Sequence, residues 1–410
     1  MKYILVIGDG MADDPVEELQ GRTPLETAEK PEIDDLARRG VLGAAKNCPE
    51  GFPVGSETAI MSLFGCSPKL YYTGRAPIEA AAQGIELQPG DAAYRCNMVT
   101  LEDGDMPMEE KRILSHSAGS IEGEDSNALV TDLFQNPEFA PLAERAGMTV
   151  TPGSSFRHIA VQHGAQIQGL KLIPPHDHLG EAAGPLLPSG CPNGEVLTEL
   201  MRKAHEILDQ HPINVRRRAE GKLPANGIWF WAEGTAATLP NFPEKYGSHG
   251  GVVSAVPLCH GIAQLVGLQP VHVEGATGEW DTNYENKVAA GLKILEKEDF
   301  LAMHLEGPDE ATHNHDLPHK LQCITDLSHK VVGPLCRALE ERGEAYRMLI
   351  VSDHRTIMKT GAHGAAPVPF ILYDSRRTEE GSGRIYTEEN GLKGPFVEDG
   401  VLLMSMLFEI

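Results

Sequence analysis

Short apolar runs alternate with longer amphipathic segments along much of the chain, and this alternation restricts the fold more than any other feature. Strands buried on both faces are predicted at YILVI (3–7), LAMHL (301–305) and RMLIV (347–351). Helices with one apolar face are predicted within 25–40, 277–298 and 323–343. Together they predict an α/β fold with a mostly parallel sheet and helices on both faces.

The pattern of predicted strands and helices changes between about residues 92 and 205. Strand-like runs with turn signals lie between helical segments there, and residues 173–194 are rich in Pro and Gly. We predict a smaller α+β domain at 92–205, inserted into a core formed by 1–91 and 206–410. GIWFWAEG (227–234) is predicted to be a strand of that core.

Composition excludes some classes of partner. The 410 residues include 35 Lys and Arg against 59 Asp and Glu, a net charge of -24. Nucleic acids and anionic membranes require a basic surface, so neither is expected as a partner. A small anionic substrate remains compatible with this composition, because local arginines or a metal can override the overall field.

The seven scattered cysteines lack a CxxC motif and predict reduced thiols. No segment reaches the roughly 20 apolar residues that span a bilayer, and a cytoplasmic protein is expected.

Acidic residues follow all three predicted core strands, at Asp9, Asp309 and Asp353. Functional groups gather beyond the carboxyl ends of strands in such sheets. Three histidines accompany them: His313 lies four residues after Asp309, and His354 and His363 follow Asp353. Such mixed oxygen and nitrogen donors suit two Mn²⁺ or Zn²⁺ ions better than Ca²⁺. The alternative is that each histidine is a surface or capping residue, which is our interpretation of His315 and His319.

Ser56 lies where a helical pattern begins, in GFPVGSETAIMSLFG (51–65). Exposed N–H groups at a helix start favour anions such as phosphate. Serine is also a preferred N-cap, so a purely structural role is the alternative. Beside a two-metal ligand set, the hydroxyl becomes a candidate nucleophile.

Motifs along essentially the whole chain resemble one family, in the same order. They are DGMAD (9–13), GSETA (55–59), YYTGRAPIEAA (71–81), PPHDHLG (174–180), DTNYENK (281–287), PDEATH (308–313), SDH (352–354) and HGAAPVP (363–369). The chain resembles the archaeal-type cofactor-independent phosphoglycerate mutases of the alkaline phosphatase superfamily. The resemblance implies a phosphatase-like core with an inserted substrate-closing domain.

The same resemblance implies roles for the candidate site residues. One metal is expected on Asp309, His313 and His363, and the other on Asp9, Asp353, His354 and the Ser56 hydroxyl. Ser56 would take the phosphoryl group of 3-phosphoglycerate as phosphoserine, and the 2-hydroxyl would take it back, without bisphosphoglycerate. This is an isomerase reaction of glycolysis and gluconeogenesis. Mn²⁺ is the expected ion, with Zn²⁺, Co²⁺ and Mg²⁺ as alternatives.

Substrate contacts are expected from the inserted domain and from one nearby arginine. The planar guanidinium group binds carboxylate and phosphate through two hydrogen bonds. The candidates for a small phosphorylated hydroxy acid are Arg75, Arg95, Arg157, His176 and Asp177. The alternative for each is a solvated surface residue.

Five positions depart from the pattern of the family that the chain resembles: Ser120, Glu233, Pro257, His260 and Ala366. Glu233 stands in place of a neutral amide, and His260 in place of a lysine. None of the five is a predicted metal ligand or the nucleophile, so the departures concern the substrate.

Two other functions therefore remain open. One is a phosphotransferase or phosphomonoesterase acting on another small substrate, such as a homoserine-kinase-like enzyme, although no GxxxxGK[ST] loop is present and a kinase would need ATP. The other is a non-enzymatic binding protein, which would be expected to lack a ligand or the nucleophile.

Overall fold

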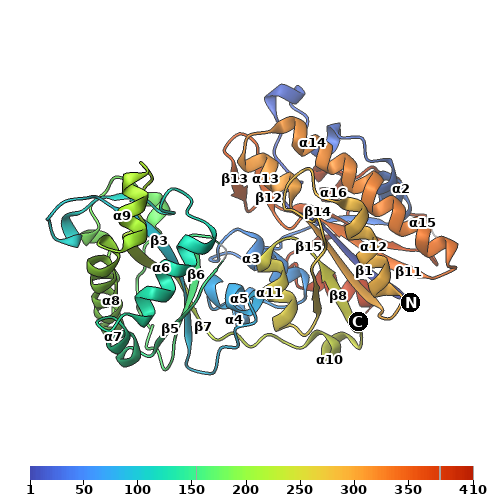
Figure 1. Ribbon diagram of the computed structural model, residues 1–410. Coiled ribbons are helices and arrows are strands. Elements are labelled where there is room, and N and C mark those ends of the chain that lie inside the picture. The colour runs from blue at the N-terminus through green and yellow to red at the C-terminus, as the bar shows by residue number, and fades with distance from the viewer. Residues whose placement is uncertain (154, 378–379, 410) are drawn as a thin grey trace. The chain divides into compact units, whose positions relative to one another are not determined.

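The computed structural model describes residues 1–153, 155–377 and 380–409. The chain forms two compact units, Met1–Tyr72 with Thr238–Ile410 and Thr73–Ala237 (Figure 1). The predicted insertion limits, 92 and 205, are wrong. Helix α5 (Arg75–Ala82) and strand β7 (Gly227–Thr235) both pack on strand β3 (Ala92–Leu101) of the second unit. An apolar strand such as β7 fits the core of either unit, so its composition does not reveal which sheet it joins.

The first unit is built on an eight-stranded sheet with the order β15–β2–β14–β11–β1–β10–β8–β9. Its strands are β1 (Lys2–Gly8), β2 (Val41–Ala45), β8 (Gly250–Val253), β9 (Gln269–Val271), β10 (Phe300–Leu305), β11 (Tyr346–Val351), β14 (Val368–Asp374) and β15 (Phe396–Val397). Strands β11, β1, β10, β8 and β9 run parallel, whereas β14 is antiparallel to both of its neighbours. The predicted α/β class with a mostly parallel sheet is confirmed.

Helices cover both faces of this sheet (Figure 1). Two neighbouring side chains of β10 contact helices on opposite faces. The ring of Phe300 packs on Phe242 of α10 (Phe242–Tyr246), with ring centroids 4.5 Å apart. The next residue, Leu301, points to the opposite face. There it faces Gly291 of α12 (Tyr284–Leu295), where an added Cβ would lie 3.0 Å from the leucine. Burial on both faces explains why the central strands are continuous apolar runs.

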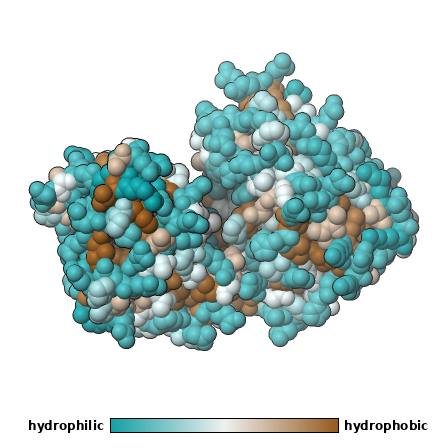
Figure 2. Space-filling view, viewed as in Figure 1, coloured by the Kyte–Doolittle hydropathy of each residue, from teal (hydrophilic) through white to brown (hydrophobic). Residues whose placement is uncertain are grey.

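The other helices of this unit are α1 (Pro24–Thr27), α2 (Pro31–Arg39), α3 (Ser56–Leu63), α4 (Pro68–Tyr71), α11 (Pro257–Leu265), α13 (Gly307–His313), α14 (Leu317–Asp326), α15 (Gly333–Glu341), α16 (Glu388–Leu392) and α17 (Leu402–Phe408). A π-helical turn, Leu327–Val332, joins α14 to α15 within the predicted helical segment 323–343. No helix in the described ranges is long and apolar enough to cross a membrane. Hydrophilic residues cover most of the visible surface of each unit (Figure 2).

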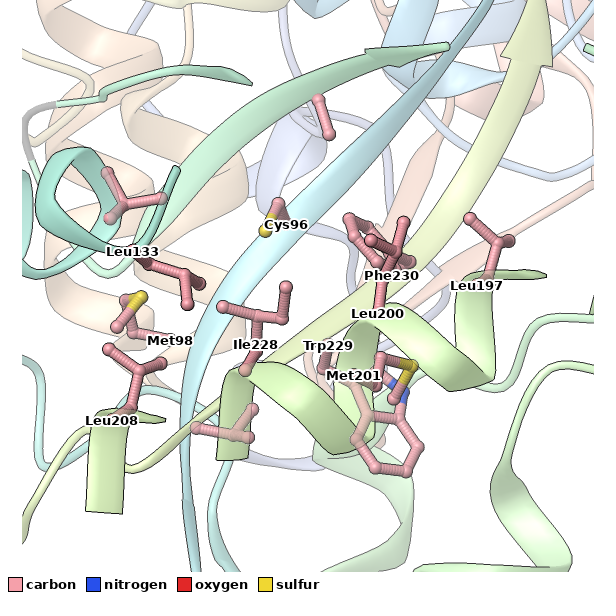
Figure 3. Packing of buried hydrophobic residues seen from close by; sticks show 14 of the residues in the cluster. Cys96, Met98, Leu133, Leu197, Leu200, Met201, Leu208, Ile228, Trp229 and Phe230 are labelled. Carbon is pink, nitrogen blue, oxygen red and sulfur yellow. The ribbon is translucent and has the colours of Figure 1, made fainter. Parts of the chain in front are cut away.

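The second unit contains a five-stranded antiparallel sheet. Strands β4 (Ile113–Ser115), β3, β6 (Arg157–Gln162) and β5 (Met148–Thr151) follow in that order, and β7 also pairs with β3. The helices are α5, α6 (Gly123–Gln135), α7 (Ala140–Arg145), α8 (Pro192–Asp209) and α9 (Pro212–Ala219). In Figure 3, Cys96 and Met98 of β3 and Phe230 of β7 lie in one core with Leu133 of α6 and Leu200 of α8.

A buried ion pair in the first unit ties the loop after β1 to the loop after β11. Lys320 Nζ in α14 donates to Asp13 Oδ2 at 2.8 Å and to the carbonyl oxygen of Thr356 at 2.7 Å. The two side chains are 0% and 1% exposed. A buried charge that loses its partner is strongly destabilising, so this pair holds the two loops together.

Replacing Lys320 by Met should lower the free energy of unfolding by about 3–5 kcal/mol, because Asp13 would keep a buried, uncompensated charge. Urea denaturation at pH 7 measures this loss. Lys46→Met is the control, because its partner Glu398 is a surface residue and exposed ion pairs contribute little. Equal losses in the two variants would contradict the assignment.

Candidate metal centre

The predicted ligands converge because three neighbouring strands end at the same edge of the sheet. Strands β11, β1 and β10 lie side by side and run parallel. Asp9 directly follows β1, and Asp353 and His354 follow β11. Helix α13 begins two residues after β10 and places Asp309 and His313 one turn apart. His363 comes from β13 (Ala362–Gly364), a strand paired with β12 (Arg355–Ile357).

Ser56 is the first residue of α3 and does not cap the helix. The N-cap position is occupied by Gly55, and no side chain makes a capping hydrogen bond. The Ser56 hydroxyl instead donates to Asp9 Oδ2 at 3.3 Å and lies 3.2 Å from His354 Nε2. The structural alternative considered for this serine therefore does not describe its contacts.

Asp309, His313 and His363 form one candidate cation site. The Nε2 atoms of the two histidines are 3.1 Å apart, and they lie 3.1 and 3.5 Å from the Asp309 carboxylate oxygens. Both Nδ1 atoms contact backbone oxygens, of Gly361 at 2.7 Å and of Val54 at 3.0 Å. These oxygens accept a hydrogen bond, so in the neutral form of each ring Nδ1 carries the proton and Nε2 presents a lone pair. Two lone pairs and a carboxylate facing one another fit a shared cation.

Asp9, Asp353 and His354 form the neighbouring part of the site. Asp9 Oδ1 and Asp353 Oδ2 are buried and have no hydrogen-bond partner among the described residues. His354 Nε2 lies 3.2 Å from Asp353 Oδ2 and 3.6 Å from Asp9 Oδ1. Burial and the nearby charge of Asp353 raise the pKa of Asp9 well above its usual value. Asp309 also lies close enough to share an ion with Asp9 and His354. Unpaired buried carboxylate oxygens of this kind fit a second divalent cation.

Several residues that support these ligands escaped the sequence analysis. Thr356 Oγ1 donates to Asp309 Oδ1 at 2.5 Å, and the backbone N–H of Gly10 donates to Asp353 Oδ1 at 3.1 Å. Asn47 Nδ2 donates to the backbone oxygens of Ser352 and Asp353. His304 contacts Asp9 from inside β10. The sequence feature that could have indicated His304 is the single histidine within the apolar run LAMHL.

His315 and His319, which we interpreted as structural, lie outside both groups of ligands. His315 Nδ1 lies 3.0 Å from the carbonyl oxygen of Met358. His319 contacts Asp316 at 2.6 Å and stacks on Trp280.

The arginines predicted to bind substrate lie in the second unit. Arg95 of β3 is opposite Trp231 of β7 in the sheet, and Arg157 of β6 is opposite Asn97 of β3. Residues 95 and 97 of a strand share one face, so both guanidinium groups leave the sheet on the side opposite the core containing Cys96 and Phe230. Arg95 and Arg75 both hydrogen-bond to the single carboxylate of Glu79.

Aromatic rings lie next to these guanidinium groups. Arg95 stacks over the ring of Trp231 at 4.7 Å, and the ring of His176 lies 5.0 Å from that tryptophan. Loss of solvent around Arg157, together with the neighbouring cations Arg95 and Arg75, lowers the pKa of its guanidinium group to about 10. No carboxylate pairs with Arg157 in the described part of the chain. Asp177 is exposed and contacts only His176 in this group, at 3.5 Å. Crowded guanidinium groups with one carboxylate between them favour an added anion.

Of the positions that depart from the family pattern, Glu233 and His260 are shielded from solvent. Glu233 is half-buried on β7, and burial raises its pKa. His260 is buried in α11 with its ring 4.6 Å from that of His272, and burial lowers its pKa. Both shifts favour the neutral side chain.

An α/β sheet with a helix-start serine, three carboxylates and three imidazoles at one edge defines a class of enzymes with a serine hydroxyl beside a metal-type donor set. Comparison with known proteins gives the family. A family model described as 2,3-bisphosphoglycerate-independent phosphoglycerate mutase matches residues 37–214. A probable 2,3-bisphosphoglycerate-independent phosphoglycerate mutase from Geobacter sulfurreducens is 42% identical over 415 residues, which cover 100% of both chains. The chain belongs to the family of 2,3-bisphosphoglycerate-independent phosphoglycerate mutases.

Two solved structures resemble the whole chain. A protein from Pyrococcus horikoshii has a TM-score of 0.80 and 29% identity, covering 100% of this chain and 98% of that one. The cofactor-independent phosphoglycerate mutase from Thermoplasma acidophilum has a TM-score of 0.64 and 25% identity, covering 100% and 99%. The family predicted from the sequence motifs is confirmed.

Mn²⁺ added to metal-free protein should raise the midpoint of thermal unfolding, and a chelator should reverse the change. A ligand that binds only the folded state stabilises it by about 2.7 kcal/mol at 100 times its dissociation constant. Scanning calorimetry with Mn²⁺ or Zn²⁺ measures the increment. His313→Ala should lose part of it, whereas His319→Ala should keep all of it. A midpoint that no divalent cation changes would contradict the site.

Proposed function

We propose that this chain interconverts 3-phosphoglycerate and 2-phosphoglycerate through a phosphoserine at Ser56, without bisphosphoglycerate. The observation that carries the proposal is the hydroxyl of Ser56, which points at Asp9 and His354 among groups suited to metals. Family membership supports the substrate. The reaction is an isomerisation shared by glycolysis and gluconeogenesis, and we assign it to the cytoplasm.

Two divalent ions complete the proposed site. Asp309, His313 and His363 would hold one, and Asp9, Asp353, His354 and the Ser56 hydroxyl would hold the other. When bound, these ions would neutralise charge on the transferring phosphoryl group and favour the alkoxide of Ser56. The mixed nitrogen and oxygen donors favour Mn²⁺, with Zn²⁺, Co²⁺ and Mg²⁺ as alternatives.

The transfer consists of two displacements at phosphorus. Ser56 Oγ gives up its proton and forms a bond to the phosphorus as the bond to the 3-oxygen breaks, and the 3-oxygen leaves with the electron pair and takes up a proton. The 2-hydroxyl of glycerate then gives up its proton and attacks, the bond from Ser56 Oγ to phosphorus breaks, and Ser56 Oγ takes a proton back. Asp9 Oδ2 and His354 Nε2 orient Ser56 Oγ for the first displacement. The substrate and product are isomers, so no atom is gained or lost.

The guanidinium cluster of the second unit, formed by Arg75, Arg95 and Arg157, is our candidate for binding the anionic groups of the substrate. Arg95 and Arg75 already share the carboxylate of Glu79. Arg157 has no such partner among the described residues, so it can give its full charge to a substrate carboxylate or phosphate. His176 lies at the edge of the same cluster, beside Trp231. Asp177 has no contact here that favours an anion, and its proposed role is limited to a hydroxyl group.

Phosphorus NMR of the Mn²⁺-loaded protein tests the proposed reaction. With 3-phosphoglycerate, and without ATP or bisphosphoglycerate, the resonance of 2-phosphoglycerate should appear. Ser56→Ala should abolish the conversion, because no other oxygen takes the place of Oγ. The variant should keep its fold by circular dichroism and most of its metal.

Each other result identifies a different enzyme. Release of free phosphate alone would indicate a phosphomonoesterase. No reaction by protein that holds its metals would redirect the search to another acceptor, with ATP and amino alcohols as the next substrates. Undiminished turnover by Ser56→Ala would exclude the phosphoserine.

Arg157→Met should lower kcat/KM for 3-phosphoglycerate by about 10- to 100-fold, since a charged hydrogen bond contributes about 1.5–3 kcal/mol. Steady-state kinetics across a range of substrate concentrations measures the change. Arg145→Met is the matched control, because Arg145 is an exposed residue of the same unit that pairs with Glu199. Similar kinetics in the two variants would remove Arg157 from the substrate site.

A further inference from the structure

His304 connects the candidate metal centre to a serine on a neighbouring strand. Its Nε2 lies 2.9 Å from Asp9 Oδ2, and its Nδ1 lies 3.0 Å from the hydroxyl oxygen of Ser254. His304 and Ser254 are each 1% exposed, and Asp9 is 0% exposed. The three residues come from adjacent parallel strands or directly follow them, since β8, β10 and β1 are neighbours in the sheet.

We propose that Ser254 and His304 form a positioning pair that holds Asp9 in the orientation needed for metal binding. This inference rests on the metal-binding part of the proposed function. Neither residue is a ligand in the two candidate groups. Their effect is exerted through Asp9.

The hydrogen-bond directions follow from the chemistry of the three groups. A carboxylate that binds a cation is ionised and only accepts, so in that state His304 Nε2 carries the proton of its hydrogen bond to Asp9 Oδ2. A charged imidazolium would have to lose its hydration at this buried position, which favours the neutral ring, and Nδ1 then accepts from Ser254. The Ser254 hydroxyl oxygen in turn accepts the backbone N–H of Val256 at 3.0 Å. Ser254 thereby fixes which nitrogen of His304 bears the proton.

This arrangement divides the two oxygens of Asp9 between different tasks. Oδ2 receives hydrogen bonds from His304 and from the Ser56 hydroxyl. Oδ1 has no hydrogen-bond partner in the described part of the chain. The pair therefore anchors one oxygen of Asp9 and leaves the other for a cation. Hydrogen-bonded partners of this kind typically change metal affinity by about 10- to 100-fold when they are removed.

The second unit contains a matched pair that has no metal ligand attached. His158 is 0% exposed, and its Nε2 lies 3.2 Å from the hydroxyl oxygen of Ser126. Its Nδ1 accepts the backbone N–H of Gly153 at 3.0 Å. Variants of this pair control for the loss of a buried histidine or serine as such.

Titration of metal-free protein with Co²⁺, followed by its visible spectrum and by the amount of bound metal, tests the positioning role. Wild-type protein should bind two ions. His304→Leu should bind one of them about 10- to 100-fold more weakly and leave the other unchanged. His304→Gln should recover most of the affinity, because its amide N–H can replace the donor to Asp9. Ser254→Ala should weaken the same ion, by less than His304→Leu.

The controls separate the possible outcomes. His158→Gln and Ser126→Ala should leave both ions unchanged. Folded His304→Leu with wild-type Co²⁺ affinity would overturn the positioning role and leave the metal site intact. If His304→Leu does not fold, Ser254→Ala with wild-type affinity would overturn it in the same way. Wild-type protein that binds no Co²⁺ would overturn the metal site and, with it, this inference.

Discussion

Unfavourable contacts between acceptor groups, most of them buried, are the constraint on which the candidate site depends. Asp9 and Asp353 each keep a buried carboxylate oxygen without a hydrogen-bond partner among the described residues. His313 and His363 direct their Nε2 atoms toward each other across 3.1 Å. The buried cation Lys320 already pairs with Asp13 and cannot neutralise this set. A bound divalent cation would replace these unfavourable contacts with attractive ones, and on this ground we propose the arrangement as a metal centre.

The fold supplies the energy that holds such groups together without the ion. Strands β11, β1 and β10 are buried along almost their whole length, and their apolar burial offsets the cost of gathering charge at one edge. Hydrogen bonds from Thr356, Gly10 and Asn47 fix the loops beyond the strands. The second unit instead has an excess of positive groups, because guanidinium groups crowd around the carboxylate of Glu79. The acceptor groups of the first unit suit a cation, and the guanidinium groups of the second unit suit an anion.

Local patterns in the sequence predicted the positions of the candidate ligands, but they did not predict which distant strands pair. Asp9, Asp309 and Asp353 were recognisable because each follows an apolar run, and parallel strands bring such ends together. The boundaries failed because pairing between β7 and β3 spans more than 120 residues of sequence, and neither strand indicates its partner. His304 was missed for a related reason. A histidine in an apolar strand predicts a buried ring, but only the order β8–β10–β1 reveals that Asp9 and Ser254 lie on either side of it.

The departures at Glu233 and His260 change the type of ionisable side chain at these positions, and burial disfavours the charged form of each. A glutamate in place of an amide would repel an anionic substrate when ionised, and burial raises the pKa of Glu233 above its usual value, which opposes that ionisation. A histidine in place of a lysine removes a cation, and burial lowers the pKa of His260 further. In the proposed function, Arg75, Arg95 and Arg157 are the candidates that offer positive charge to the substrate. Guanidinium groups remain charged across the physiological pH range, so the charge of these three arginines does not change with pH in that range.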